Sequence, residues 1–263
     1  MSNIQAETVR RVASAQEQLD NLVRPELPDD LISPFLALPG LRAFYPMSAV
    51  GTAGEARDLG GSGATYDLTL NGNPRFNYSG LVPHCDYDGT GDYHSFVDDA
   101  NFDIRGTEAY VIAAVRGLTW GGWFYPEETG TTEGLITKWG AAAQRAYQIQ
   151  LTAADQFAAL ISDDGTNSDT ATSAAVAMDA WYCVIGRFIP GAFVDIFVNG
   201  VETNQVTARA SVFNSNADFV IGARTGGAIP FQGRISLSFI CAEQLSDAIL
   251  SSLFQQTRAA FGV

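Results

Sequence analysis

The chain has 263 residues, 46% of them hydrophobic, so it is long enough to bury a full core in one main domain. Asp and Glu total 29 against 15 Lys and Arg, which gives a formal net charge of −14 at pH 7. This charge argues against nucleic acid and anionic membrane surfaces, because both would repel the chain. Neutral, cationic or apolar partners are expected instead.

The first predicted element is an N-terminal amphipathic helix within residues 1–23. Over residues 4–23, an apolar stripe has steps compatible with three-and-four spacing: Val9, Val12, Gln16 (filling a gap), Leu19 and Val23. An isolated helix with one apolar stripe is marginal in water and needs a surface to cover. We predict that it anchors or oligomerises the chain, by binding other copies or another protein; folding back onto its own domain is the alternative.

No targeting or membrane segment is expected. Arg10 and Arg11 are not followed by an apolar stretch, so neither a secretory nor a twin-arginine signal is predicted. No run of residues approaches the length of a membrane span. Three widely spaced cysteines do not suggest a disulfide framework, and Cys183 and Cys241 lie in apolar runs that predict buried thiols. The chain is therefore expected to be made in the cytoplasm.

Residues 24–40 are predicted to be a Pro-rich linker. Pro25 and Pro28 stand among three acidic residues in the run RPELPDD, which disfavours both helix and strand. The preceding helix is therefore expected to stand apart from the rest of the chain.

From about residue 107 the pattern becomes one of short apolar, β-branched and aromatic runs separated by Gly, Asn, Asp and Pro, which is typical of strands. Their close spacing predicts antiparallel sheets. The candidate strands are 108–116, 118–125, 134–139, 146–152, 156–162, 181–188, 193–198, 201–206, 218–222 and 232–241.

Two local signals mark a hairpin and the last element. Asn199-Gly200 predicts a two-residue hairpin turn, because both turn positions need positive φ. Ser246-Asp247 is expected to cap a short C-terminal helix. The apolar face of that helix comprises Ile249, Leu250, Leu253 and Phe254.

Nine short motifs, in chain order, carry a resemblance to a known family. They occupy residues 41–46, 69–74, 87–93, 118–124, 135–140, 181–184, 194–200, 231–235 and 245–250. Together they resemble the concanavalin A-like lectin/glucanase superfamily, most closely its laminin-G-like branch, over about residues 41–255. The resemblance implies an all-β fold, a two-sheet antiparallel jelly-roll sandwich over residues 41–263. It also implies carbohydrate or protein binding by edge loops or by a concave sheet face, with some members acting as glycanases.

The sequence offers no catalytic residues. The glucanases of this superfamily carry two carboxylates in a Glu-x-Asp-x-x-Glu run, which is absent here. Glu127, Glu128 and Glu133 lie in a Thr- and Gly-rich segment and are interpreted as a solvated face. His84 and His94 are the only histidines, too few for a multi-histidine zinc site. We therefore predict that the protein is not an enzyme.

No cofactor is predicted, with calcium as the one alternative left open. Hard oxygen ligands cluster at Asp86, Asp88 and Asp92, at Asp98 and Asp99, and at Asp163, Asp164, Asn167 and Asp169. No specific ligand motif is matched. Turn chemistry explains the same residues, because Asp and Asn side chains cap turns.

A carbohydrate site is predicted at Trp139, the best candidate for an exposed aromatic ring. Trp123 and Trp181 occupy strand positions that are core in the resembled family, so they are interpreted as structural. Polar partners for a sugar on Trp139 would come from Asp163, Asp164, Asn167 and Asp169. An ordinary turn explains that loop equally well.

The sequence favours a non-enzymatic structural or adhesion protein, tethered by its N-terminal helix to a larger assembly. By elimination, the assembly is expected to be a bacteriophage virion, as a head decoration or tail appendage completed in the host cytoplasm. Cell-surface glycans are a further candidate partner. One alternative is a bacterial carbohydrate-binding module or atypical glycan-active enzyme, exported by a route without a signal. The other is a protein-binding scaffold.

Overall fold

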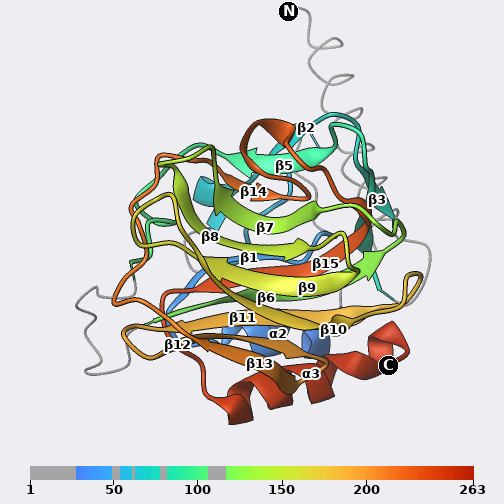
Figure 1. Ribbon diagram of the computed structural model, residues 1–263. Coiled ribbons are helices and arrows are strands. Elements are labelled where there is room, and N and C mark those ends of the chain that lie inside the picture. The colour runs from blue at the N-terminus through green and yellow to red at the C-terminus, as the bar shows by residue number, and fades with distance from the viewer. Residues whose placement is uncertain (1–27, 49–53, 61–62, 78–81, 106–116) are drawn as a thin grey trace, which may run out of the picture.

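The computed structural model describes residues 28–48, 54–60, 63–77, 82–105 and 117–263, which form a two-sheet sandwich with two helices on one side (Figure 1). The predicted helix over 4–23 and the predicted strand over 108–116 lie outside the described residues. None of the described helices is long and apolar enough to cross a membrane.

The eight-stranded sheet is entirely antiparallel, with the strand order β13-β12-β11-β6-β15-β4-β3 and with β1 also paired to β15. Its strands are β1 (Leu41–Tyr45), β3 (Arg75–Asn77), β4 (His84–Asp88), β6 (Leu118–Pro126), β11 (Tyr182–Ile189), β12 (Phe193–Val198), β13 (Val201–Thr207) and β15 (Gln232–Cys241).

The seven-stranded sheet is also antiparallel, in the order β10-β9-β8-β7-β14-β5-β2. Its strands are β2 (Thr69–Asn71), β5 (Tyr93–Phe96), β7 (Glu133–Trp139), β8 (Arg145–Leu151), β9 (Gln156–Ile161), β10 (Asp169–Ala175) and β14 (Phe219–Ile221). Two short 3₁₀ turns, Gly63–Tyr66 and Thr225–Gly227, lie in the connections.

The main core fills the space between the sheets, as the period-two alternation of the strands requires. Trp120 of β6 points inward and meets Tyr147 of β8 at a ring-centroid distance of 5.8 Å. Phe102 stacks on Phe219 at 4.4 Å. The jelly-roll sandwich expected from the sequence is therefore confirmed.

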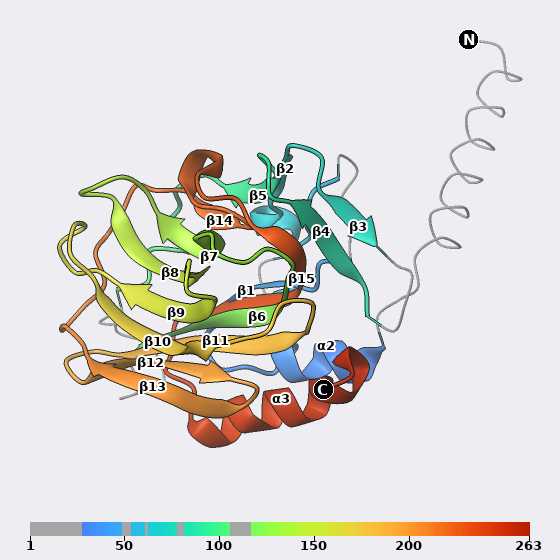
Figure 2. The same cartoon turned by 45° about the vertical axis from the view of Figure 1, so that its right-hand side comes forward.

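A second apolar layer covers part of the outer face of the eight-stranded sheet. It lies beneath α2 (Asp29–Leu36) and α3 (Asp247–Phe261), which run side by side (Figure 2). Trp123 points outward into this layer, where it stacks on Phe261 of α3 at 3.9 Å. The Trp123 indole also donates a hydrogen bond to Thr257 of α3, at 3.1 Å. The interpretation of Trp123 as a core residue is confirmed.

The described part of the predicted linker 24–40 is not a linker. It contains α2, whose Leu31 and Phe35 are buried against the sheet, and Phe35 stacks on Phe44 of β1 at 4.8 Å. Pro28 only precedes the first turn, where a missing N–H costs nothing. Burial of the apolar face offsets the hydrogen bond lost at Pro34 inside the helix.

Several other local predictions are confirmed. Asn199 and Gly200 have φ values of 52° and 76° and join β12 to β13. Ser246 caps α3 by accepting a hydrogen bond from the Ile249 N–H. Cys183 and Cys241 are buried free thiols. The prediction that strands begin near residue 107 was wrong, because β1 to β5 precede it.

Candidate functional site

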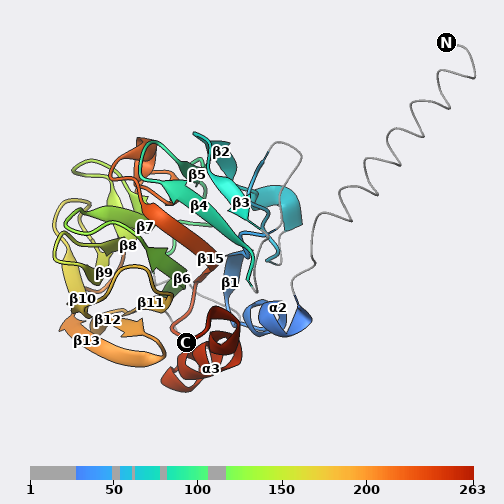
Figure 3. The same ribbon diagram turned by 90° about the vertical axis from the view of Figure 1, so that its right-hand side faces the viewer.

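Beyond the two helices, the outer face of the eight-stranded sheet carries a row of aromatic and charged side chains. Strand register places Arg234 of β15 between Tyr125 of β6 and Asp86 of β4. Arg75 of β3 faces Asp86 on the far side. Trp181, just before β11, extends the row beside Tyr125. Figure 3 shows β3, β4 and the start of β15 away from α2 and α3, so neither of these helices covers this part of the face.

A groove of about 420 Å³ opens along this row. The turns between β2 and β3 and between β4 and β5, together with the residue that follows β6, form its walls. Its lining is almost wholly polar: Asn73, Arg75, Asp86, Tyr87, Asp88, Asp92, Glu127, Gln232 and Arg234. We call this the polar groove.

Arg234 is the centre of the polar groove. Its Nη2 lies 2.9 Å from Glu127 Oε1 and its Nε lies 3.4 Å from Asp86 Oδ1. The same guanidinium lies 4.4 Å from the centroid of the Tyr125 ring. Tyr125 in turn meets Trp181 at 5.5 Å, edge to face. These contacts hold one cation, two carboxylates and two aromatic rings in a single surface.

Two carboxylates of the polar groove already have partners within the chain. The charged form of Asp86 is stabilised by its neighbours, and Asp92 holds a turn by hydrogen bonding. Burial alone would raise the pKa of Asp86, but contacts with His84, Asn77 and Arg234 lower it below its ordinary value. Asp92 is buried, and its Oδ1 accepts a hydrogen bond from the Asn73 N–H at 2.7 Å. Asp86 therefore lacks the raised pKa that a general acid needs, and Asp92 is engaged in holding the backbone of the turn.

Two polar side chains of the groove are available to a ligand. Among the described residues, neither the Arg75 guanidinium nor the Gln232 side-chain amide has a hydrogen-bond or ion-pair partner. Arg75 is exposed and Gln232 is half-buried at the start of β15. Both side chains line the polar groove, so a ligand there can use a cationic donor and an amide.

The prediction of an exposed ring at Trp139 was wrong. Its side chain ends β7 and is only 3% exposed, packed with Ala158 and Leu160 on the outer face of the seven-stranded sheet. The guanidinium groups of Arg145 and Arg224 lie 5.7 and 5.8 Å from its ring centroid. A sugar ring therefore cannot stack on Trp139 as the structure stands.

The loop that was expected to assist Trp139 is held by its own contacts. Asp164 accepts hydrogen bonds from the N–H groups of Thr166 and Asn167, and Asn167 also donates through its amide. Arg209 pairs with Asp163 at 2.5 Å, and its backbone N–H donates to Asp169. The turn interpretation explains these four residues, and their role in sugar binding stays a prediction.

The acidic clusters considered for calcium are dispersed among other partners. Asp98 pairs with the buried Lys138 at 2.5 Å, and Asp99 accepts a hydrogen bond from the Asn101 N–H. In the part of the chain that the structure describes, no group of three His, Cys, Asp or Glu residues is arranged to hold a metal ion.

Glu133 does not belong to a solvated face, contrary to expectation. It begins β7, is 1% exposed, and accepts a hydrogen bond from Thr131 at 3.0 Å. Burial raises its pKa to about 7. The hydrogen bond from Thr131 opposes this rise, and the negative charge on Glu128 adds to it.

Trp181, which was interpreted as a core residue, is only half-buried. Its ring contacts those of Phe261 and Tyr125.

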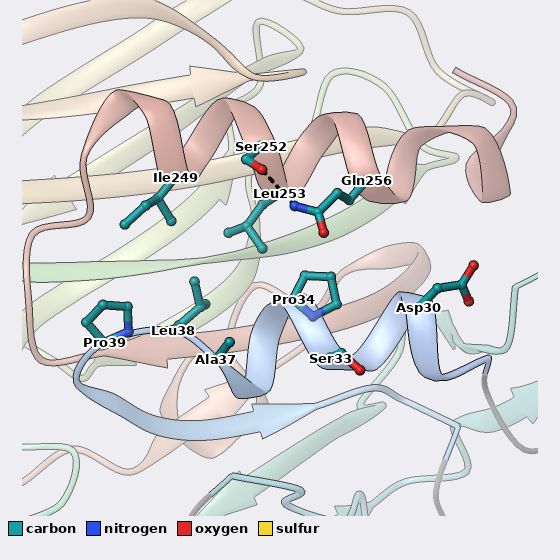
Figure 4. A pocket seen from close by; sticks show the side chains of 10 residues that line it. All are labelled: Asp30, Ser33, Pro34, Ala37, Leu38, Pro39, Ile249, Ser252, Leu253 and Gln256. Carbon is teal, nitrogen blue, oxygen red and sulfur yellow. Dashed lines mark hydrogen bonds between the residues drawn. The ribbon is translucent and has the colours of Figure 1, made fainter.

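A second groove, of about 470 Å³, runs between α2 and α3 (Figure 4). Pro34 and Leu38 line one side and Ile249 and Leu253 the other, so its floor is mainly apolar. The polar side chains at its rim include Gln256, which donates a hydrogen bond to Ser252. It offers fewer groups to orient sugar hydroxyls than the polar groove does.

A laminin G family model, described as the concanavalin A-like lectin/glucanases superfamily, matches residues 88–248. The chain belongs to this superfamily. No curated protein matches it by sequence.

Solved structures of similar fold include binding domains of toxins. The binding domain of Paraclostridial Mosquitocidal Protein 1 has a TM-score of 0.62 at 12% identity, covering 82% of this chain and 52% of that one. The botulinum neurotoxin serotype G binding domain has a TM-score of 0.62 at 12% identity, covering 82% and 50%. The botulinum neurotoxin serotype D ligand-binding domain, in complex with N-acetylneuraminic acid, has a TM-score of 0.62 at 9% identity, covering 86% and 52%. The chain spans about half the length of these structures.

Proposed function

We propose that the protein is a non-enzymatic glycan-binding module whose ligand lies in the polar groove. The observation that carries the proposal is the groove itself: its lining residue Arg234 stacks on the adjoining Tyr125 ring, and its Arg75 and Gln232 side chains have no partner among the described residues. Sugars combine apolar C–H faces with hydroxyls, so they bind where an aromatic edge adjoins amides and charged groups. Superfamily membership supports a lectin-like role.

The charge of the groove favours neutral or amino sugars. Four carboxylates line it, namely Asp86, Asp88, Asp92 and Glu127, against the two guanidinium groups of Arg75 and Arg234. An acidic sugar would meet a net negative surface on a chain that is itself strongly acidic. A neutral sugar would use the carboxylates as acceptors for its hydroxyls.

The state of these carboxylates supports binding without cleavage. Glycoside hydrolysis needs one carboxyl group with a raised pKa to protonate the leaving group. In the groove, Asp86 and Glu127 both pair with Arg234, and the pKa of Asp86 is lowered. The similar structures are themselves described as binding domains.

A glycan array probed with the full chain tests this function. We expect a restricted set of neutral or amino-sugar glycans to bind, with no reducing sugar released. Tyr125→Ala and Arg234→Gln should each weaken binding about tenfold, the effect of losing one good polar or aromatic contact. Arg258→Gln, on the exposed side of α3, is the matched control.

Two outcomes would overturn the proposal. One is an array without signal, which together with a stable protein complex would favour the scaffold alternative. The other is binding that both groove variants retain. Release of reducing sugar would contradict the non-enzymatic part alone.

A finer proposal concerns the setting in which the module works. We infer an adhesion role in which the segment before α2 tethers the sandwich to a larger assembly, with a phage virion as the specific hypothesis. The amphipathic pattern of residues 4–23 supports the tether. Light scattering on the full chain and on a chain starting at Pro28 tests it. If the full chain is a multimer and the chain starting at Pro28 is a folded monomer, self-assembly through the N-terminal segment is supported. If both are monomers, it is contradicted.

A further inference from the structure

Two arginines meet over one tryptophan on the outer face of the seven-stranded sheet, the sheet opposite the polar groove. Arg145 begins β8 directly opposite Trp139, the last residue of β7. Arg224 follows β14 and approaches the same ring. Both arginine side chains are half-buried, so solvent reaches them while Trp139 beneath is covered.

Neutral groups hold both guanidinium groups in place. Arg224 donates from Nε to Gln148 Oε1 at 2.8 Å and from Nη2 to Gln150 Oε1 at 2.9 Å. Arg145 donates from Nη1 to the Thr166 carbonyl oxygen at 2.5 Å. The two cations are thus preorganised by amides and a carbonyl without being neutralised.

This pair differs from three other arginines of the sandwich. Arg187, Arg209 and Arg234 each lie within 4.0 Å of a carboxylate. Within the described residues, no carboxylate approaches Arg145 or Arg224 in this way, although the chain has 29 acidic residues. Arg145 Nε is buried without a hydrogen-bond partner.

The missing counter-charge has an energetic consequence. Burial lowers the pKa of Arg224, and the positive charge of Arg145 lowers it further. Two like charges held close together destabilise the folded chain unless an anion neutralises them. Nη2 of Arg145 and Nη1 of Arg224 have no hydrogen-bond partner among the described residues, so both can donate to such an anion.

We propose that Arg145 and Arg224 form a second binding site, specific for a carboxylate-bearing sugar. The planar fork of a guanidinium matches the two oxygens of a carboxylate. Around the arginines, the same face carries the amides of Gln148 and Gln150, with Ala158 and Leu160 packed against Trp139. Thr170 and Thr172 lie farther away, on the edge strand β10. A surface of amides and small apolar groups suits a saccharide ring better than a peptide side chain, which needs a pocket.

The site is chemically distinct from the polar groove. The groove has more carboxylates than cations and suits a neutral sugar, whereas the arginine pair has cations alone. An acidic glycan could therefore bind one sheet while a neutral glycan binds the other, and the two sites can be tested separately.

A nuclear magnetic resonance titration of the full chain with D-glucuronate tests the proposal. We expect shifts at the Nε–H groups of Arg145 and Arg224 and at the Trp139 indole. Arg145→Gln and Arg224→Gln should each weaken binding about tenfold or more, as expected for a lost charge-assisted bond. Arg145→Lys keeps the positive charge but not the planar guanidinium, so its affinity for glucuronate should lie between those of wild type and Arg145→Gln. Arg234→Gln and Arg258→Gln should leave the affinity unchanged.

Neutral and sugar-free probes decide the ligand class. The methyl ester of glucuronate should not bind, and acetate should bind more weakly than glucuronate. Equal binding of the methyl ester, equal binding of acetate, or no shifts with glucuronate would each overturn the proposal.

A thermal melt without ligand separates a binding role from a structural one. Arg145→Gln should raise the melting temperature slightly, because it removes like-charge repulsion, and should abolish the rise that glucuronate produces in the wild-type chain. A large fall in melting temperature for both Arg145→Gln and Arg145→Lys would mean that the arginines only pack on Trp139, and would contradict the proposal.

Discussion

The ionisation of Glu133 is coupled to folding. Its pKa is raised to about 7 in the folded chain, above the ordinary value of 4.5. A carboxyl group with a raised pKa favours the folded state while protonated, so that contribution is lost as pH rises from about 4.5 through 7. The shift corresponds to a loss of up to about 3 kcal/mol.

Glu133→Gln should therefore change the pH dependence of stability. In urea denaturation the variant should be about 1–3 kcal/mol more stable than wild type at pH 8, and nearly equal to it at pH 4.5. Glu202→Gln, at an exposed position of β13, is the control and should shift neither value appreciably. If the difference in free energy of unfolding between wild type and Glu133→Gln were the same at pH 8 and at pH 4.5, this account would be contradicted.

Single side chains were the least predictable from sequence. Glu133 and Trp139 both stand at ends of β7, beside runs that look like loops. Their burial depends on residues distant in the chain: Gly134 next to Glu133 pairs with Ile229, and Arg224 covers Trp139. No local pattern reports such long-range neighbours.

At the scale of elements, α3 is attached to the sheet by a buried cation. Arg187 of β11 pairs with Asp195 of β12 at 2.6 Å and also donates to the Leu245 carbonyl just before α3. Asp195→Ala would leave that guanidinium buried without its main partner and should cost about 3 kcal/mol of unfolding free energy.

The matched control for this ion pair is Asp247→Ala. Asp247 also contacts Arg187 at 2.6 Å, but its side chain is 71% exposed. An exposed pair contributes below about 1 kcal/mol, so chemical denaturation should separate the two variants clearly. Equal losses for both would contradict the buried-pair explanation.

The aromatic end of α3 gives a second prediction at this scale. Phe261 is 7% exposed and stacks on Trp123. Phe261→Ala should lower the free energy of unfolding by about 3 kcal/mol. Tryptophan fluorescence, followed during unfolding, measures this loss. Val263→Ala, two residues on and 38% exposed, should be nearly neutral. Similar midpoints for both variants would show that the stack contributes little.

Elements with strong periodicity were predictable, and those with weak periodicity were not. The strands from Leu118 to Cys241 follow apolar runs and were predicted except for β10, whose sequence DTATSAA is polar and small. β10 forms because it pairs with β9, a tertiary effect. α2 was missed because Pro25, Pro28 and the acidic residues around them were interpreted as disfavouring helix, although Leu31 and Phe35 are buried.

At the scale of the whole molecule, the two helices divide the outer face of the eight-stranded sheet. The covered part is apolar, and the open part carries the polar groove. The sandwich could be predicted from the ordered motifs, whereas the polar groove depends on strand register. Arg75 and Asp86 come from the consecutive strands β3 and β4, but Tyr125 and Arg234 come from β6 and β15, much later in the chain. One usable signal was the alternation in β4 and β15, where Asp86 and Asp88, and Gln232 and Arg234, point to the same side.

The most direct measurement of the central claim is a crystal structure of the full chain with the oligosaccharide selected by the array. The account predicts a sugar in the polar groove, with its apolar face near Tyr125 and its hydroxyls bonded to Arg75, Gln232 or Arg234. The glycosidic bond should remain intact. A neutral sugar bound elsewhere, with the polar groove containing only solvent, would contradict the assignment of this groove as the glycan site.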